Sequence, residues 1–247
     1  MNIIRNQKRT GSNSGSINKQ KRILIILRDI VSKDCFYISD GGKVHFLYQK
    51  KEDVYALVGS IREKFGYAGC NSADITELII PNTINGKDLK YISGDTFECM
   101  RNLKRIIIEE DNKYFSLIEG GLYTKDMTEL IRMSPQFTDS CYRVLDGVEM
   151  VCDSSIDNPY IETLILPDGC RIIEEYGITG STNIKRVFIP KSIEIIGRYN
   201  FRDADLTDVY YGGNEKDREH IIDQWGEKML LDKTEWHYNC KMQDCIS

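Results

Sequence analysis

The residues of this chain that could support catalysis or bind a metal are few and widely spaced. Its three histidines, His45, His220 and His237, have no Cys or His partner at the spacing of a zinc site, and no CxxC pair occurs. The sequence contains neither a GxxxxGK[ST] phosphate-binding loop nor an HExxH motif. Acidic pairs such as Glu109/Glu110 are adjacent, so their side chains should diverge on a strand or loop. We therefore expect a non-enzymatic protein without a catalytic, cofactor-binding or metal site.

The eight cysteines are irregularly spaced. In a small secreted domain they would suggest a disulfide framework, but a chain of 247 residues is large enough to build its own core. The sequence therefore favours free thiols in a reducing compartment. Cys99 and Cys170 fall where a repeat needs a small buried residue, and Cys240 and Cys245 are close enough in sequence to bridge under oxidising conditions.

Charge and hydropathy favour a soluble globular protein and give no sign of nucleic-acid binding. The net charge is −5, with 29% charged and 41% apolar residues. Residues 1–22 carry basic side chains, no acidic ones and a Gly/Ser-rich stretch, which is typical of a disordered basic tail. The tail is either simply solvated or an arm for a membrane or nucleic acid.

The apolar run Ile23–Leu27 is too short for the core of a signal peptide or for a transmembrane segment. It fits a short helix ending near Ser32, or an added strand. We therefore expect a cytoplasmic protein, with the cell surface or secretion as the alternative.

The segments that organise the chain recur every 20 to 30 residues. Ile161–Pro167 returns as Ile184–Pro190 and as Leu206–Gly212, and a fourth copy stands at Ile75–Pro81. Such a period with fixed apolar anchors predicts a solenoid, because one unit cannot bury its apolar face alone. The first, fourth and sixth residues of each segment should point inward, and Pro after the strand suits a corner. The predicted fold class is mainly β with minor α: a solenoid with a parallel sheet on one face.

This periodicity divides the chain into four regions. They are the disordered tail 1–22, an N-terminal capping region 23–74, the repeats 75–212, and a C-terminal helix–strand cap 213–247. The capping region should contain a β-hairpin, and a second hairpin at 111–135, turning at Lys125–Asp126, should protrude from the stack. In the C-terminal cap a helix is expected over 214–228 with Asn214 as its N-cap, followed by a short strand at 236–238.

The fifth residue of each repeated strand should face outward, where parallel strands would align these residues in one stripe. The stripe is mostly apolar or aromatic and is a candidate protein-binding face. The alternatives are ordinary strand-forming residues, or a stripe covered by the N-terminal segment. The stripe comprises Ile79, Ile107, Arg143, Ile165, Phe188 and Tyr210. Basic side chains at Lys104, Arg105, Lys185 and Arg186 flank it and would set charge complementarity or form a solvated rim.

The repeats resemble the BspA-like leucine-rich repeat family. The resemblance rests on the pattern Ile-x-x-Val-x-Ile-Pro-x-Ser-Ile-x-x-Ile-Gly-x-x-x-Phe at 184–201 and on its weaker copy at 80–103. The segments 112–132 and 206–238 are similar to the family's hairpin insert and terminal unit. The resemblance implies a leucine-rich-repeat solenoid with no enzymatic activity and no cofactor. It also implies binding to a protein partner, with surface adhesion to host protein or carbohydrate, or self-association, as alternatives.

Overall fold

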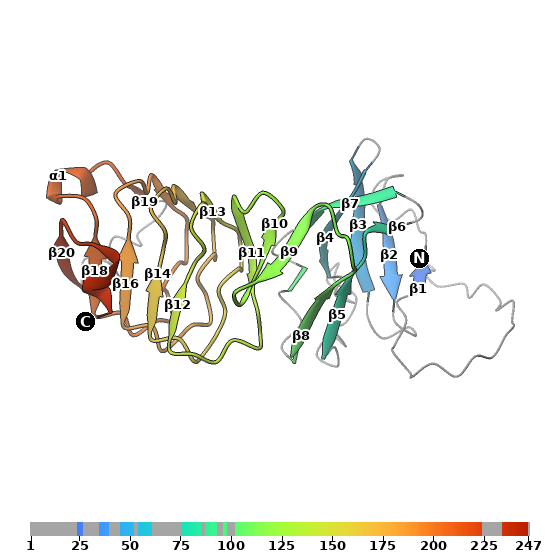
Figure 1. Cartoon of the computed structure of the whole chain (residues 1–247), viewed down its shortest axis with the longest axis horizontal. Coiled ribbons are helices and arrows are strands. Elements are labelled where there is room, and N and C mark those ends of the chain that lie inside the picture. Colours follow the sequence, from blue (N-terminus) through green and yellow to red (C-terminus); the bar gives the residue numbers. More distant parts are fainter. Residues whose placement is uncertain are drawn as a thin grey trace, which may run out of the picture.

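We describe the fold from a computed structural model. It describes residues 24–26, 35–39, 45–51, 54–60, 76–84, 87–92, 96–97, 102–223 and 234–246. The predicted basic tail 1–22 lies outside these residues. The regular secondary structure of the described chain is almost entirely β-strand, and the chain forms an elongated stack of coils with a separate sheet at the N-terminal end (Figure 1). The predicted fold class, a mainly β solenoid, is confirmed.

The N-terminal sheet has the strand order β1-β2-β3-β4-β7-β6. Strands β2 (Cys35–Ser39) and β3 (His45–Lys51) form the expected antiparallel hairpin, and β4 (Val54–Ser60) pairs with β3. The run at Ile23–Leu27 contains a strand, β1 (Leu24–Ile26), rather than a helix. The sheet then passes into the first repeat, because β4 pairs in parallel with β7 (Lys87–Ile92). A short hairpin between β6 (Thr83–Ile84) and β7 accounts for the greater length of that repeat.

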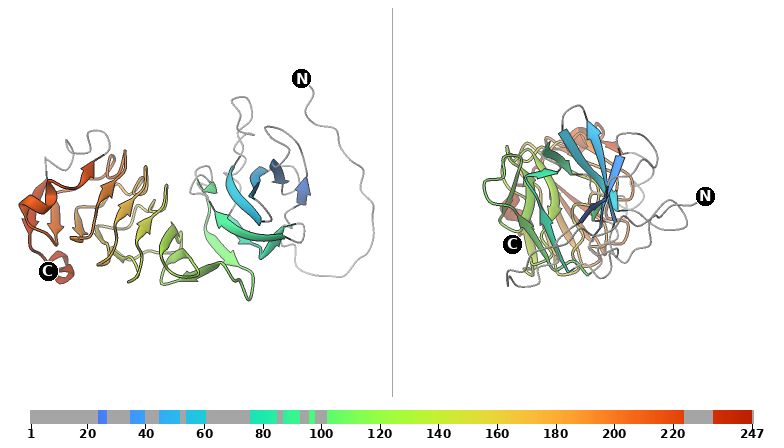
Figure 2. Two further views of the ribbon diagram at one scale, coloured as in Figure 1. Left: turned by 90° about the horizontal axis from the view of Figure 1, so that it is seen from above. Right: turned by 90° about the vertical axis from the view of Figure 1, so that its right-hand side faces the viewer.

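The repeats build two sheets on opposite sides of one core (Figure 2), of which the first is parallel and the second is parallel except at one end. The first sheet has the order β12-β14-β16-β18-β20, and the second runs β19-β17-β15-β13-β11-β10-β9. The last three strands are β11 (Glu129–Met133), β10 (Gly121–Thr124) and β9 (Phe115–Ile118), which pair antiparallel. Each coil adds one strand to each sheet, so the sequence period becomes the spacing between paired strands. The strands of the first sheet are β12 (Cys141–Arg143), β14 (Thr163–Ile165), β16 (Arg186–Ile189), β18 (Asp208–Tyr211) and β20 (Glu235–Tyr238). The short strands of the second are β13 (Met150–Val151), β15 (Ile172–Ile173), β17 (Ile195–Ile196) and β19 (Ile222–Asp223).

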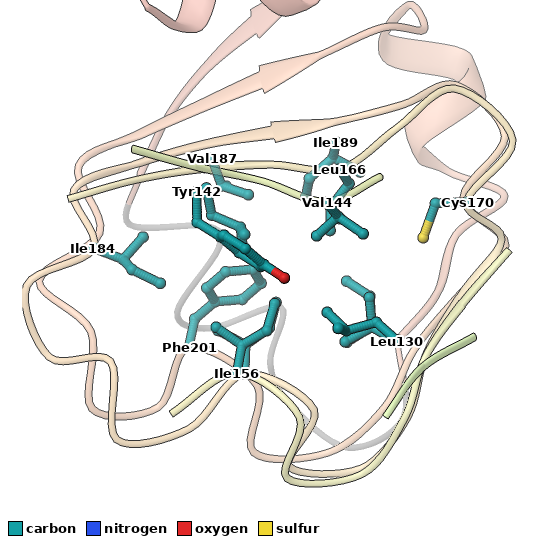
Figure 3. Packing of buried hydrophobic residues seen from close by; sticks show 14 of the residues in the cluster. Leu130, Tyr142, Val144, Ile156, Leu166, Cys170, Ile184, Val187, Ile189 and Phe201 are labelled. Atoms are coloured by element: carbon teal, nitrogen blue, oxygen red, sulfur yellow. The ribbon is translucent and has the colours of Figure 1, made fainter. Parts of the chain in front are cut away.

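The core lies between these two sheets and consists of the residues predicted to point inward. Ile161, Leu164 and Leu166 are fully buried, as are their counterparts Ile184, Val187 and Ile189 one coil later. Phe201 fills the far side of its coil, opposite Val187 (Figure 3). Because each coil contributes the same anchors, the apolar side chains of successive coils stack into one continuous column.

The corner after the second sheet is held by a buried polar side chain. Asn200 is fully buried and accepts a hydrogen bond from the backbone N–H of Ile178 at 2.8 Å. Its amide nitrogen donates to the carbonyl oxygens of Glu174 and Gly197, both at 2.8 Å. Ser155 holds the equivalent corner two coils earlier, and its hydroxyl lies 2.6 Å from the carbonyl oxygen of Cys152. These bonds satisfy backbone groups that the short strands leave unpaired.

The segment 111–135 does not protrude from the stack, contrary to the prediction. The expected hairpin forms between β10 (Gly121–Thr124) and β11 (Glu129–Met133), but β9 (Phe115–Ile118) joins it as a third antiparallel strand. The three strands continue the second parallel sheet, because β11 pairs with β13. Their side chains alternate between two cores: Tyr123 and Leu130 belong to the core of the later repeats, whereas Leu122 and Ile131 belong to the core of the first units. This alternation is the reason that the insert is integral to the fold.

The first repeats form that second, smaller core. Strands β5 (Glu77–Ile80) and β8 (Arg105–Ile108) pair in parallel as a sheet of two strands, separate from the five-stranded sheet. Leu78, Ile80 and Ile106 point into this core together with Phe97, which is 2% exposed. The repeat sheet is therefore interrupted between β8 and β12, where the insert lies.

The helix of the C-terminal cap is shorter than predicted. Helix α1 covers only Glu215–Arg218, with Asn214 as its N-cap in a capping box with Asp217. The chain then enters β19, which pairs with β17. The β-branched pair Ile221–Ile222 favours this strand, and pairing with the preceding coil outweighs the helical spacing of the apolar residues. Residues 224–233, with the expected core residue Trp225, lie outside the described part of the chain.

Candidate binding surface

The outer face of the five-stranded sheet carries two rows of side chains. The register aligns residues of neighbouring strands directly, and alternate residues point away from the core. The first row is Cys141, Thr163, Arg186, Asp208 and Glu235, and the second is Arg143, Ile165, Phe188, Tyr210 and His237. The second row contains four of the six residues predicted to form the stripe.

The centre of this stripe is covered, not exposed as predicted. Ile165 is 0% and Phe188 is 2% exposed. The cover is the short 3-10 turn η3 (Met242–Cys245), which contacts β14, β16 and β18. Its buried residue Cys245 forms a small apolar cluster with Ile165 and Phe188, and Met242 packs against that cluster. The cover is therefore the C-terminal segment, and not the N-terminal segment that the sequence offers as an alternative.

The C-terminal segment is fixed to the sheet by backbone hydrogen bonds at its start. The N–H of Asn239 donates to the carbonyl oxygen of Gly213 at 2.9 Å, and that of Cys240 donates to the carbonyl oxygen of Tyr211 at 3.0 Å. Asn239 has a left-handed backbone with φ of 56°, a conformation that Asn tolerates better than most residues. This turn brings the chain from the end of β20 back across the outer face of the sheet.

The other predicted surface residues do not form one continuous face. Arg143 and Lys185 are exposed at the edge of the covered cluster, and Arg186 and Tyr210 are half-buried beside it. The side chain of Arg143 pairs with Asp146 at 3.1 Å.

The remaining four lie on the separate sheet β5–β8. Ile79 and Ile107 are register partners there, half-buried and facing away from the core of the first units. Lys104 and Arg105 are exposed next to them, and Arg105 pairs with Glu77 at 3.1 Å. The insert therefore divides the predicted stripe into a part that η3 covers and a half-exposed part at Ile79 and Ile107, called the open part below.

The polar end of the outer face was not predicted. Nε2 of His237 lies 2.9 Å from Oδ1 of Asp208, and the imidazole stacks on the ring of Tyr210 with centroids 4.6 Å apart. The hydroxyl of Thr207 donates to Oδ2 of Asp208 at 2.6 Å. The hydrogen bond from His237, together with that from Thr207, lowers the pKa of the Asp208 carboxyl. Linear spacing gave no signal for this group, because Asp208 and His237 are 29 residues apart and meet only through strand pairing.

The thiols provide a test of how tightly the C-terminal segment is docked. Burial raises the pKa of Cys170 and of Cys245 to about 12. At pH 8 a pKa of 12 leaves a thiolate fraction of about 10⁻⁴, and the thiolate is the form that reacts. We expect both residues to resist iodoacetamide at pH 8 in the folded protein and to react completely in urea, measured by mass spectrometry of peptides. Cys170, in the main core, is the internal control. If Cys245 reacted rapidly while Cys170 did not, the segment would open frequently.

Comparison with known proteins gives the same family as the repeat pattern. Residues 144–219 match the model for the BspA type leucine rich repeat region, with six copies. No curated protein matches this chain. Within the described ranges, no helix is long and apolar enough to cross a lipid bilayer.

Solved structures with a similar chain trace come from bacteria. A leucine-rich repeat protein from Eubacterium ventriosum ATCC 27560 is 18% identical over 56% of this chain and 36% of its own, with a TM-score of 0.49. The pneumococcal vaccine antigen PcpA is 16% identical over 70% of this chain and 53% of its own, with a TM-score of 0.38. A leucine rich cell surface protein from Faecalibacterium prausnitzii A2-165 is 18% identical over 60% of this chain and 50% of its own, with a TM-score of 0.32. The chain thus spans about a third to half the length of these proteins.

The family assignment rests on the repeats themselves and on the family model. The matched residues include the strands β14, β16 and β18, whose inward anchors form the continuous core. Residues 144–219 of this chain are therefore leucine-rich repeats of the BspA type.

Proposed function

We propose that this chain is a non-enzymatic protein-binding module and that its partner docks on the open part of the outer face, at Ile79 and Ile107. The observation that carries this proposal is the occupant of the covered part. There the same outward positions, Ile165 and Phe188, hold the side chains of Met242 and Cys245 from a short turn of the chain itself. The outward residues of this row can therefore bind apolar side chains of a segment that lies across the parallel strands.

The open part offers similar chemistry with a positive border. Ile79 and Ile107 lie side by side on β5 and β8, and the exposed side chains of Lys104 and Arg105 adjoin them. Burial of an apolar side chain favours association, and basic residues at the rim steer an acidic partner. The Glu77–Arg105 pair is solvent-exposed and contributes little by itself, so Arg105 can exchange Glu77 for a partner carboxylate at small cost. The partner that fits best is a protein segment with apolar side chains flanked by acidic ones.

Two other functions fit the same surface less well. Self-association would need the face to match a second copy. Carbohydrate binding usually relies on exposed aromatic rings, whereas the open part presents isoleucines. A catalytic role has no support in the described residues, where the buried cysteines have raised pKa values and hence little thiolate.

The proposal is tested with the full chain carrying a photo-crosslinking amino acid at position 107, and at position 160 as a control. Tyr160 is 57% exposed on the later repeats, away from the proposed face. We expect a saturable protein cross-link from position 107 but not from 160. The captured protein, once purified, should bind the unmodified chain, and Ile79→Ser/Ile107→Ser should weaken its Kd at least about ten-fold. Tyr160→Ser should leave the Kd unchanged.

Three results would count against this assignment. A cross-link between two copies of the chain would replace the partner with self-association, which light scattering would verify. The absence of any saturable cross-link at position 107 would show that the partner does not dock on the open part. A Kd that Ile79→Ser/Ile107→Ser leaves unchanged would show the same. Circular dichroism of the double variant checks that it is folded. Fractionation of native cells decides between the expected cytoplasm and the surface location that the family resemblance implies.

A further inference from the structure

We propose that Asp208, Glu235 and His237 form a zinc-binding site at the polar end of the outer face. One ligand atom from each side chain can be chosen so that all three lie within 4.8 Å of one another. They are the one group of three His, Cys, Asp or Glu side chains found in such an arrangement in the part of the chain that the structure describes. This inference concerns a different set of residues from the proposed binding face and does not depend on it.

The fold places the three ligands through strand pairing. Asp208 lies on β18, and Glu235 and His237 lie on β20, the neighbouring parallel strand. Asp208 is the register partner of Glu235, while His237 follows Glu235 by two residues and so points to the same side of the sheet. A metal bound here would link the last two strands of the solenoid.

Two neighbours hold the ligands in position. The ring of Tyr210 stacks on the imidazole of His237 at an interplanar angle of 24°. The hydroxyl of Thr207 donates to Oδ2 of Asp208, which leaves Oδ1 directed at His237. Contacts from neighbouring side chains to the ligands orient the ligands and contribute to metal affinity.

Electrostatics favour a cation at this point of the sheet. Asp208 and Glu235 are carboxylates directly opposite each other on adjacent strands, an arrangement that destabilises a sheet through like-charge repulsion. Arg186 is the register partner of Asp208 on its other side, so β18 separates it from Glu235. A divalent cation between the two carboxylates would convert this repulsion into attraction.

The ligand set indicates which cation. One imidazole nitrogen and two carboxylate oxygens form a mixed set that suits Zn²⁺, whereas Ca²⁺ and Mg²⁺ prefer oxygen ligands alone. Zinc bonds of about 2.0–2.2 Å bring tetrahedral ligands to about 3.4 Å from one another. The exposed Glu235 would move toward the other two ligands, and Oδ1 of Asp208 and Nε2 of His237, now 2.9 Å apart, would exchange their hydrogen bond for zinc and separate by about 0.5 Å. The side chains of His237 and Asp208 are 33% and 28% exposed, so water can enter and complete the coordination.

The test uses the metal-free full chain titrated with Zn²⁺, observed through imidazole ¹⁵N signals. The chain has three histidines, so the signals are few and His237→Gln assigns one of them. We expect zinc to shift the His237 signal selectively and to raise the Tm by about 5 °C at a hundred-fold excess over Kd. Glu235→Gln, a change at an exposed position, should weaken the Kd at least about ten-fold.

His220→Gln is the matched control, because His220 is exposed and lies outside the cluster. It should leave both the Kd and the Tm increase unchanged. Zinc bound by cysteines instead would appear with Co²⁺ as a thiolate charge-transfer band and would not shift the His237 signal. Binding of zinc by cysteines would overturn the proposal. So would a His237 signal that does not shift at saturating zinc, or a Kd that neither Glu235→Gln nor His237→Gln changes.

Discussion

Replacing Phe188 by Ala is expected to lower the free energy of unfolding by about 3 kcal/mol and to release the C-terminal segment from the sheet. Phe188 is 2% exposed, and its ring lies in the apolar cluster beneath η3 with Ile165 and Cys245. Loss of the ring removes apolar contact and leaves a cavity that the docked turn can fill only in part. The estimate stands at the lower end of the range for Phe→Ala because one wall of the site is a movable segment. Urea denaturation measures the loss, and limited proteolysis near residue 239 measures the release.

Tyr160→Ala is the control, because this side chain is 57% exposed and should change stability by less than about 0.5 kcal/mol. An unchanged denaturation midpoint for Phe188→Ala, together with unchanged cleavage near residue 239, would mean that η3 does not cover Phe188 in solution. In that case the stripe would be an open binding face as the sequence first predicted. If the midpoint of Phe188→Ala is unchanged but cleavage near residue 239 is faster, the substitution releases the C-terminal segment without lowering the stability of the core.

Replacing Asn200 by Leu is expected to cost about 3 kcal/mol or more, although the two side chains have a similar size. Asn200 satisfies three backbone groups at the corner: the N–H of Ile178 and the carbonyl oxygens of Glu174 and Gly197. Leu cannot replace any of these bonds. The carbonyl oxygen of Glu174 keeps a hydrogen bond from the N–H of Gly177, but the N–H of Ile178 and the carbonyl oxygen of Gly197 lose theirs, and each unsatisfied buried group costs about 1–3 kcal/mol. Urea denaturation followed by circular dichroism measures the effect.

Asn183→Leu is the matched control. Asn183 is exposed and donates a single hydrogen bond, to the carbonyl oxygen of Pro159 at 2.6 Å. We expect it to cost less than about 1 kcal/mol. Equal effects at the two positions would show that the corner is solvated and that Asn200 is not required to hold it.

The repeat geometry could be predicted from the sequence because it depends on local pattern. Anchors such as Ile161, Leu164 and Leu166 recur at fixed spacing, and a stack of equal coils is the arrangement that buries them all. The same spacing placed Ile165 and Phe188 on the outer face, and the structure has them there. Pattern alone therefore determined which way each side chain of the repeats points.

Errors arose where a segment could satisfy its local pattern in two ways. The helical spacing of Ile221, Ile222 and Trp225 favours a long helix, but pairing of β19 with β17 joins this segment to the preceding coil, and an isolated helix at the end of the chain lacks such a tertiary interaction. The insert 111–135 was predicted to protrude, because a hairpin sequence does not reveal that its two faces belong to two cores.

The sequence by itself determined the repeat, the inward anchors and the absence of a familiar catalytic motif. Only the tertiary structure decided which part of the outward row stays open, because that depends on where the C-terminal segment folds back. It also decided that Asp208 and His237 meet, since residues far apart in the chain become neighbours only when two coils stack in register. Side-chain direction follows from the period of a strand, whereas contact across coils depends on the pitch and register of the whole solenoid.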